Sequence, residues 1–303
     1  MNPEIIIIGC ANVDILACPA SKKVFDEGHY NCDTISMSVG GDALNEATIL
    51  SRLGKKVELI CTLGKDEAGN YLMNKALQCG IQIDSCCQKE KLMTSTNIVL
   101  VDDKGNRNFL INKNSSLRKL TRDDVPPLNP NAKILSFASI FIFTDFLEEG
   151  LSSLFSEAKE KNLIVCADTT RCKNQETVED LKKTLPLMEY IFPNENEAFM
   201  FTHGNTVEEC ASILKEAGVK NVIIKCGEKG CYVLNDEISK WYPVKEKVHC
   251  IDTTGAGDSF VAGFIKCLSE DKTLDECIEF ANFCGSKNVQ MVGATEWSKE
   301  FCK

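Results

Sequence analysis

The stretch DTTGAGDSF at residues 252–260 combines a turn of small residues with a carboxylate. Gly255, Ala256 and Gly257 precede apolar residues at helical spacing, so the turn should lie at the N-terminus of a helix. The first N–H groups of a helix have no partner within it, and together they carry roughly half a positive charge. An anion about 4 Å away would gain on the order of 2 kcal/mol at an effective dielectric of about 20. The turn can therefore serve as an anion hole for a transferring phosphoryl group.

Asp258 follows this turn directly. A carboxylate there can take the proton from a substrate hydroxyl that attacks phosphorus. It can equally well stabilise the first turn of its helix, and the nonapeptide alone does not separate the two roles. Two common phosphate-binding motifs are absent: Phe260 stands where a dinucleotide fingerprint needs glycine, and G-x-x-x-x-G-K-[ST] occurs nowhere in the chain.

Short apolar runs, which are typical of buried parallel strands, alternate with helical patterns along the chain. The runs cover residues 4–9, 57–61, 132–138, 162–168, 190–193 and 221–227. Between them, Ala43, Ala47 and Leu50 recur at helical spacing, and Thr273 with Glu276 forms a capping box before another helix. This alternation predicts an α/β fold in which helices cover both faces of a mainly parallel sheet.

Two segments, residues 12–38 and about 94–112, break this alternation. In both segments polar and apolar residues alternate one by one, and the second has turn residues 102–106 in its middle, as in antiparallel hairpins. We therefore expect a small antiparallel β lid that projects from the main part of one domain spanning residues 1–303.

Composition excludes several classes of protein. The chain has 303 residues, and its formal net charge of −10 argues against nucleic acid as a partner, because phosphate neutralisation needs a basic face. The N-terminal apolar run of four isoleucines is too short for a signal peptide or a membrane span, so we expect a cytoplasmic protein without a membrane partner. The 17 cysteines include the adjacent pair Cys86 and Cys87 but no C-x-x-C, and we interpret them as thiols buried in the core.

The segments GGDALNEATILSRLG (40–54) and DTTGAGDSFVAGF (252–264) resemble the two signature regions of the ribokinase family of sugar and nucleoside kinases, the PfkB group. Further motifs follow in the expected order, so the resemblance covers essentially the full length: IIGCANVDI (7–15), GKDEAGN (64–70), FPNENEA (192–198) and IIKCGEKG (223–230). Within the family, the chain is most similar to a bacterial subgroup of poorly characterised sugar kinases. The resemblance implies a ribokinase-like three-layer α/β/α sandwich with a β lid.

The resemblance also implies roles for individual residues. Asp258 would be the base and Gly255 to Gly257 the anion hole. The implied substrate-binding residues are Asp14, Gly40, Gly41, Asp42, Asn45, Arg107 and Lys113. The carboxylates of Asp14, Asp42 and Asp258 in one pocket would repel a sugar phosphate but suit sugar hydroxyls, so we expect an unphosphorylated sugar. Arg107 and Lys113 in the lid segment could offset this charge or bind a carboxylate of the substrate.

On the nucleotide side, Asn194-x-x-Glu197 resembles the family motif that organises Mg²⁺ and the phosphates of ATP, largely through water. The same spacing is also a capping box, and the two roles can coexist. The other implied ATP-binding residues are Lys225, Gly227, Gly230, Asn282 and Arg171. Asp252 and Thr254 correspond to residues that line a monovalent-cation site in many members, so K⁺ activation is a hypothesis.

We therefore predict an enzyme that transfers the γ-phosphate of ATP to a hydroxyl of an unphosphorylated monosaccharide, by family expectation an exocyclic hydroxyl. Homodimers formed through the lids are common in the family, and we expect one here. One alternative is a nucleoside kinase, for which Phe25, Tyr30 and Phe109 of the lid segments and the stretch FIFTDF (141–146) could form a slot for the base. The other is an inactive sugar-binding regulator, which the intact GAGD and N-x-x-E motifs disfavour.

Overall fold

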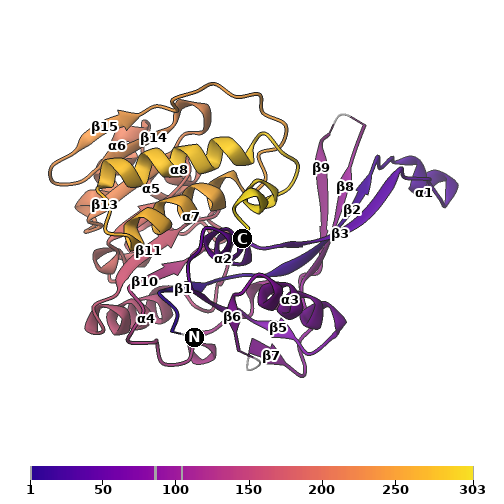
Figure 1. Ribbon diagram of the computed structural model, residues 1–303, viewed down its shortest axis with the longest axis horizontal. Coiled ribbons are helices and arrows are strands. Elements are labelled where there is room, and N and C mark those ends of the chain that lie inside the picture. The colour runs from indigo at the N-terminus through magenta and orange to yellow at the C-terminus, as the bar shows by residue number, and fades with distance from the viewer. Residues whose placement is uncertain (1, 85–86, 104, 303) are drawn as a thin grey trace.

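A computed structural model of the chain describes residues 2–84, 87–103 and 105–302, so Cys86 of the adjacent cysteine pair lies outside the described residues. Within them, the central sheet has nine strands in the order β15-β14-β13-β12-β11-β10-β1-β4-β6 (Figure 1). Their bounds are β1 Ile5–Ile8, β4 Val57–Ile60, β6 Gln82–Ile83, β10 Ile134–Phe137, β11 Ile164–Asp168, β12 Tyr190–Phe192, β13 Asn221–Lys225, β14 Cys231–Leu234 and β15 Ser239–Tyr242. The strands from β6 to β13 are parallel, and β14 and β15 extend the sheet antiparallel.

Each apolar run that was predicted to be a strand contributes one strand to this sheet, and β1 shows why the runs are continuous. Ile5 and Ile7 belong to the hydrophobic core on one face, whereas Ile6 and Ile8 belong to the core on the other. Because successive side chains of a strand point to opposite faces, a strand covered on both faces needs apolar residues at every position.

Helices form the outer layers of the sandwich. Residues of α2 (Asp42–Arg52), α3 (Glu67–Gln78), α7 (Ala256–Ser269) and α8 (Leu274–Asn288) belong to the core with Ile5. Residues of α4 (Glu148–Glu160), α5 (Glu195–Thr202) and α6 (Val207–Glu216) belong to the core with Ile6. The predicted α/β fold with three layers is therefore confirmed. Shorter elements are the parallel pair β5 (Leu63–Gly64) and β7 (Gln88–Lys89) and the 3₁₀ turns η2 (Ser116–Arg118), η3 (Arg122–Asp124), η4 (Val178–Leu181), η5 (Leu185–Leu187), η6 (Gly227–Lys229) and η7 (Glu296–Phe301).

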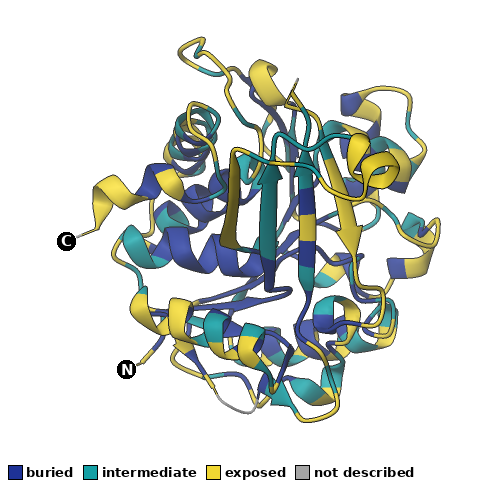
Figure 2. Cartoon of the chain, turned by 90° about the vertical axis from the view of Figure 1, so that its right-hand side faces the viewer, coloured by how far each residue is buried: buried dark blue, intermediate teal, exposed yellow. Residues whose placement is uncertain are grey.

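A second, four-stranded sheet projects from the sandwich (Figure 1). Its order is β3-β2-β8-β9, with bounds β2 Asn12–Cys18, β3 Thr34–Gly40, β8 Thr96–Val101 and β9 Arg107–Ile111. The pairs β2–β3 and β8–β9 are antiparallel hairpins, as predicted, while the inner strands β2 and β8 pair in parallel. The short helix α1 (Lys23–Glu27) lies between β2 and β3. Figure 2 shows that much of this sheet is exposed or only partly buried, unlike the strands of the sandwich.

The four cysteines singled out as core residues, Cys61, Cys166, Cys267 and Cys277, are buried free thiols, whereas Cys250 and Cys302 are exposed, so the prediction of buried thiols is wrong for these two. Among the described residues, we find no helix of the length and apolarity that a membrane crossing requires.

Phe137 on β10 is fully buried, and its ring makes edge contacts with Phe143, Phe146 and Phe155 at centroid distances of 5.9, 5.2 and 6.3 Å. We expect Phe137→Ala to lower the free energy of unfolding by about 3–5 kcal/mol, because it removes buried apolar surface and leaves a cavity. Urea denaturation followed by circular dichroism measures the change. Phe25→Ala is the matched control, since this side chain is 81% exposed, and its effect should stay within about 0.5 kcal/mol. Equal losses in the two variants would contradict the prediction.

Candidate active site

Polar side chains gather where parallel strands of the central sheet end, among them the predicted site residues Asn194 and Lys225. Asp168 is the last residue of β11 and Lys225 the last of β13, while Ser139 and Asn194 follow β10 and β12. Ligands of open α/β sheets bind outside the carboxyl ends of the strands, so the fold itself brings these residues to one edge.

Asp258 lies in the first turn of α7 and is buried. Asn45 Nδ2, from α2, donates a hydrogen bond of 2.7 Å to Asp258 Oδ2, which brings together two predicted site residues that are 213 positions apart. Burial raises the pKa of Asp258 well above its usual range, and the Asp42 carboxylate raises it further, whereas the Asn45 amide opposes the shift. The side chain is thus fixed in position and poorly hydrated.

The turn before Asp258 depends on glycine. Gly255 has a left-handed backbone with φ of 75°, and a Cβ added there would lie 2.5 Å from Ala294 Cβ. Ala256 and Gly257 then begin α7. Position 255 therefore admits only glycine, and the turn packs directly against the segment that contains Ala294.

The C-terminal segment supports this turn. Trp297 is buried, and its Nε1 donates to Ser259 Oγ at 2.9 Å, in the first turn of α7. Arg52 at the end of α2 donates to the main-chain oxygen of Thr295 at 2.6 Å. Neither Trp297 nor Arg52 was singled out from the sequence, because each acts through a partner far away in the chain.

Asp14 on β2 lies among amide donors. Its Oδ1 accepts hydrogen bonds from Asn12 Nδ2 at 2.7 Å and from Asn97 Nδ2 at 2.9 Å. A Cβ on Gly40 would collide with Asp14 Oδ2, so Gly40 leaves room for this carboxylate. Burial raises the pKa of Asp14, against the effect of the two amides. The sequence indicated Asp14 and Gly40, but it did not indicate Asn97, which comes from the other hairpin.

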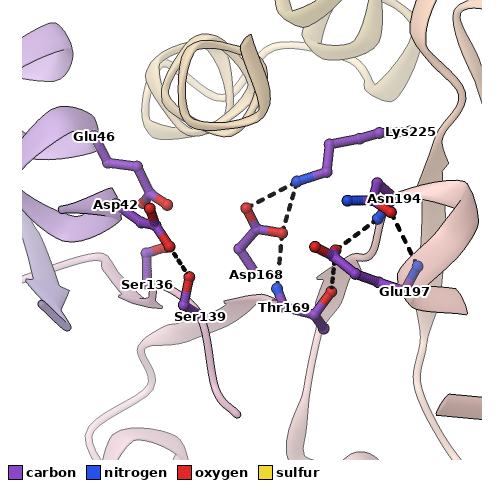
Figure 3. Close-up of polar contacts among 9 residues, drawn as sticks. All are labelled: Asp42, Glu46, Ser136, Ser139, Asp168, Thr169, Asn194, Glu197 and Lys225. Carbon is purple, nitrogen blue, oxygen red and sulfur yellow. Dashed lines mark hydrogen bonds and ion pairs between the residues drawn. The ribbon is translucent and has the colours of Figure 1, made fainter. Parts of the chain in front are cut away.

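Two carboxylates of α2 face the end of β10 (Figure 3). Asp42 accepts a hydrogen bond from Ser139 Oγ, and Gly41 before it is the N-cap of the helix. Glu46, one turn later, is fully buried and accepts a hydrogen bond of 3.2 Å from Ser136 Oγ, while its Oε1 has no partner among the described residues. Burial, and after it the charge of Asp168, raises the pKa of Glu46 well above its usual range. The sequence analysis missed Glu46, although a glutamate within an apolar helical pattern is a visible signal.

Lys225 and Asp168 form a buried ion pair (Figure 3). Lys225 Nζ lies 2.7 and 2.8 Å from the two carboxylate oxygens, and a Cβ on Gly257 would lie 3.3 Å from the same Nζ. The ammonium thus lies beside the turn of α7. Burial raises the pKa of Asp168 to about 6 although Lys225 opposes this shift. Burial lowers the pKa of Lys225, but Asp168 and Glu197 outweigh that effect and the net shift is upward.

Asn194 and Glu197 form the capping box of α5 (Figure 3). The main-chain N of Glu197 donates a hydrogen bond of 2.9 Å to Asn194 Oδ1. In return, Glu197 Oε2 accepts from Asn194 N at 3.0 Å, and it also accepts from Thr169 Oγ1 at 2.8 Å. No cluster of three or more His, Cys, Asp or Glu in the described residues could hold a metal ion by itself. Magnesium commonly takes one or two carboxylates and completes its shell with water and phosphate oxygens. The residues present therefore fit a water-mediated magnesium site.

The lid strand β9 reaches the loop that precedes α7. Arg107 Nη1 donates to Thr254 Oγ1 at 2.6 Å, and Arg107 Nη2 lies 2.7 Å from Asp252 Oδ2. The structure therefore joins three predicted site residues in a way that the sequence did not indicate. Arg107 was expected to face the substrate, and Asp252 with Thr254 was expected to face a monovalent cation.

Two of the remaining predicted nucleotide-side residues, Gly230 and Asn282, meet at the main-chain oxygen of Tyr242. Gly227 and Gly230 flank the turn between β13 and β14, and a Cβ on Gly230 would collide with the main-chain oxygen of Tyr242. Asn282 on α8 donates to that same oxygen at 3.3 Å. Arg171 and Lys113 are exposed, and no hydrogen bond or ion pair of either side chain is found within the described part of the chain.

Comparison with known proteins agrees with this architecture. The profile of the pfkB family carbohydrate kinases matches residues 2–300. An uncharacterized sugar kinase of Archaeoglobus fulgidus is 30% identical over 253 residues, which cover 82% of this chain and 96% of that one. The ribokinase of Haemophilus influenzae is 26% identical over 303 residues, covering 97% and 94%.

A solved structure from Escherichia coli in complex with ATP and Mg²⁺ has the same fold, with a TM-score of 0.83 at 22% identity and coverage of 99% and 97% of the two chains. Sequence profile, relatives and fold thus agree over essentially the whole chain. The protein therefore belongs to the PfkB family of carbohydrate kinases.

Proposed function

We propose that this ATP-dependent carbohydrate kinase phosphorylates a hydroxyl of an unphosphorylated monosaccharide, with Asp258 as the general base. The observation that carries the proposal is the placement of Asp258: its carboxylate is held by Asn45 in the first turn of α7. The Lys225 ammonium lies beside the same turn, at Gly257. A proton acceptor and two sources of positive potential thus meet at one point.

Each of these groups has a task in the reaction. The N–H groups of Gly255 and Gly257 and the Lys225 ammonium stabilise negative charge on the phosphoryl group in transfer, whereas the N–H of Ala256 already donates to the main-chain oxygen of Thr253. Asp258 accepts the proton of the attacking hydroxyl. Bound magnesium would neutralise part of the charge on the ATP phosphates, and Asn194 and Glu197 would orient its water ligands. Gly227, Gly230 and Asn282 would line the nucleotide, and Arg171 could reach its phosphates from the loop after β11.

The substrate side of the site favours a neutral polyol. Asp14 and Asp42 offer carboxylate oxygens to hydroxyl groups, and Gly40 and Gly41 admit close approach. Burial raises the pKa of Asp14 and the charge of Arg107 acts from a distance to lower it, but the Arg107 guanidinium is engaged with Asp252 and Thr254. Lys113 remains exposed and could meet an acidic group of the substrate. Ribose, the sugar in the name of the H. influenzae relative, is therefore a first candidate, with phosphorylation at the exocyclic hydroxyl.

Two other functions are tested by the same assay. A nucleoside acceptor would need a slot for its base, and Phe25 and Phe109 of the lid segments are exposed, at 81% and 53%, so they are available for such a contact. Phe141, Phe143 and Phe146 of the predicted slot are instead buried in the core and do not contribute to it. A sugar-binding regulator without activity would have no use for a buried carboxylate beside a helix N-terminus. The residues expected to line a potassium site, Asp252 and Thr254, are in contact with Arg107.

We also propose that the protein dimerises through the lid sheet. The strand registers place Met37, Ile15, Ile98 and Leu110 in one row across the sheet, on the face opposite Asp14. Met37 and Leu110 are each 53% exposed and Ile98 is 39% exposed. An apolar face of this kind is typical of a protein–protein contact.

Asp258→Asn should lower kcat by about 10²–10⁴-fold while ATP still binds, because the amide accepts no proton but keeps the size of the side chain. The measurement is ADP release with Mg-ATP across ketoses, aldoses, sugar acids, sugar phosphates and nucleosides. Asp26→Asn on the exposed helix α1 is the charge-matched control and should retain full activity. Undiminished turnover of Asp258→Asn would exclude Asp258 as the base, and activity on fructose 6-phosphate alone would exclude a neutral substrate.

The pH dependence of kcat/KM should report the raised pKa of Asp258. Asp258 accepts a proton only when ionised, so activity falls as the pH drops through its pKa, and this acidic limb should lie above the usual aspartate value of about 3.9. Asp42→Asn removes a charge that raises this pKa, so the limb should move to lower pH. A limb that stays in place or moves upward in Asp42→Asn, with Asp26→Asn unchanged, would contradict this assignment.

Met37→Asp should convert a lid-mediated dimer into monomers, because it places a charge in the centre of the apolar face. Sedimentation velocity at micromolar concentration measures the effect. Ser36→Asp adds the same charge to the preceding residue of β3, whose side chain lies on the other face, and should leave the dimer intact. A wild-type protein that sediments as a monomer, or dimers in both variants, would rule out this interface.

A further inference from the structure

The contact between the lid and the loop before α7 carries an inference beyond the reaction itself. Arg107 is the first residue of β9, and its register with Val101 places it on the face of the lid sheet that also bears Asp14. Its guanidinium binds Asp252 and Thr254 at once, at 2.7 and 2.6 Å. The side chains of Arg107 and Asp252 are only 23% and 9% exposed, so the pair is largely shielded from water.

The Asp252 carboxylate is fully engaged. Its Oδ1 accepts from the main-chain N of Thr254 at 3.0 Å and from Thr254 Oγ1 at 2.7 Å. Its Oδ2 accepts from the main-chain N of Gly293 at 3.0 Å and from Arg107. Two carboxylate oxygens offer about four lone-pair sites, and all of them have donors here. Thr254 Oγ1 is likewise used, both as a donor to Asp252 and as an acceptor from Arg107.

A monovalent cation therefore does not fit these side chains as they stand. Potassium needs oxygen atoms with free lone pairs, and the place beside Asp252 and Thr254 already holds the positive charge of a guanidinium. The residues predicted to line a potassium site, Asp252 and Thr254, thus already bind the Arg107 guanidinium.

Asp252 holds two segments that shape the anion hole. Thr254 immediately precedes Gly255, and Gly293 immediately precedes Ala294, against which Gly255 packs. The Asp252 carboxylate thus hydrogen-bonds to the segments on both sides of the turn, and Arg107 connects this carboxylate to the lid sheet. We propose that Arg107 is a positioning residue that takes the place of a monovalent cation beside Asp252 and links the lid to the anion-hole turn.

The effect of Arg107 on kcat rests on the proposed function. Whether its guanidinium takes the place of a monovalent cation can be tested without turnover. Melting temperatures are measured for wild type, Arg107→Ala and Arg107→Lys in the chlorides of potassium, guanidinium and tetramethylammonium. Each salt is used at about 10 mM, so that the ionic strength is the same in all three. Wild type should melt alike in all three salts. Arg107→Ala should melt on the order of 2 °C lower in tetramethylammonium and recover in potassium or guanidinium, because a small cation can enter the vacated place.

Controls separate this effect from unspecific salt binding. Lys23→Ala removes a positive charge from α1 of the lid sheet, away from Asp252, and should behave as wild type. Arg107→Ala combined with Asp252→Asn should lose the response to cations, because no carboxylate remains to bind them. A cation response that persists in this double variant, or an equal response in wild type, overturns the proposal.

The kinetic test asks whether Arg107 positions the turn or binds the substrate. With the acceptor found in the substrate panel, Arg107→Ala should lower kcat roughly tenfold to a hundredfold, as expected for a lost charge-assisted hydrogen bond, and change the acceptor KM little. Arg107→Lys should recover part of kcat. A higher acceptor KM with unchanged kcat would instead make Arg107 a substrate ligand. If no acceptor is turned over by wild type, the proposed function fails, while the melting experiment still decides the role of Arg107.

Discussion

The Lys225 ammonium lies between the Asp168 carboxylate and the turn at Gly257, in a site that otherwise consists largely of carboxylates. Asp168, Glu197 and Asp258 all interact with it. Like charges repel strongly where water is excluded, so carboxylates this close need a shared cation. That same ammonium also lies beside the first turn of α7 at Gly257, which we propose as the anion hole. One side chain thus balances the resting site and prepares it for additional negative charge.

The sheet makes this concentration of charge possible. Its inner strands are buried on both faces, and the carboxyl ends of the parallel strands lie at the same edge, so Asp168 and Lys225 meet there although 57 residues separate them. Helices α2 and α7, which pack on the same face of the sheet, supply Asn45 and Asp258. The apolar packing is therefore what holds the polar groups at hydrogen-bond distance, because none of the pairs could overcome the entropy of the chain alone.

The sequence was sufficient for the elements whose signals are local. The continuous run of β1, the capping box of α8 and the small-residue turn before Asp258 each depend on neighbouring residues, and the structure contains all three. It was insufficient for partners that only the fold brings together. Asp168 was visible only as the end of a strand, Asn97 had no motif, and the contact of Arg107 with Asp252 joins residues 145 positions apart. Periodicity carries no information about which of several charged side chains will meet across a domain.

The support of the α7 turn by the C-terminal segment has a consequence for the order in which the protein is built. A ribosome releases the strands of the central sheet and most of α7 before it releases Ala294 and Trp297, which pack against Gly255 and hydrogen-bond to Ser259. The sandwich can gain most of its core while the chain is still growing. The turn before Asp258, in contrast, gains its support only when Ala294 and Trp297 have been synthesised, so the core can form before the turn that positions Asp258 is held in place.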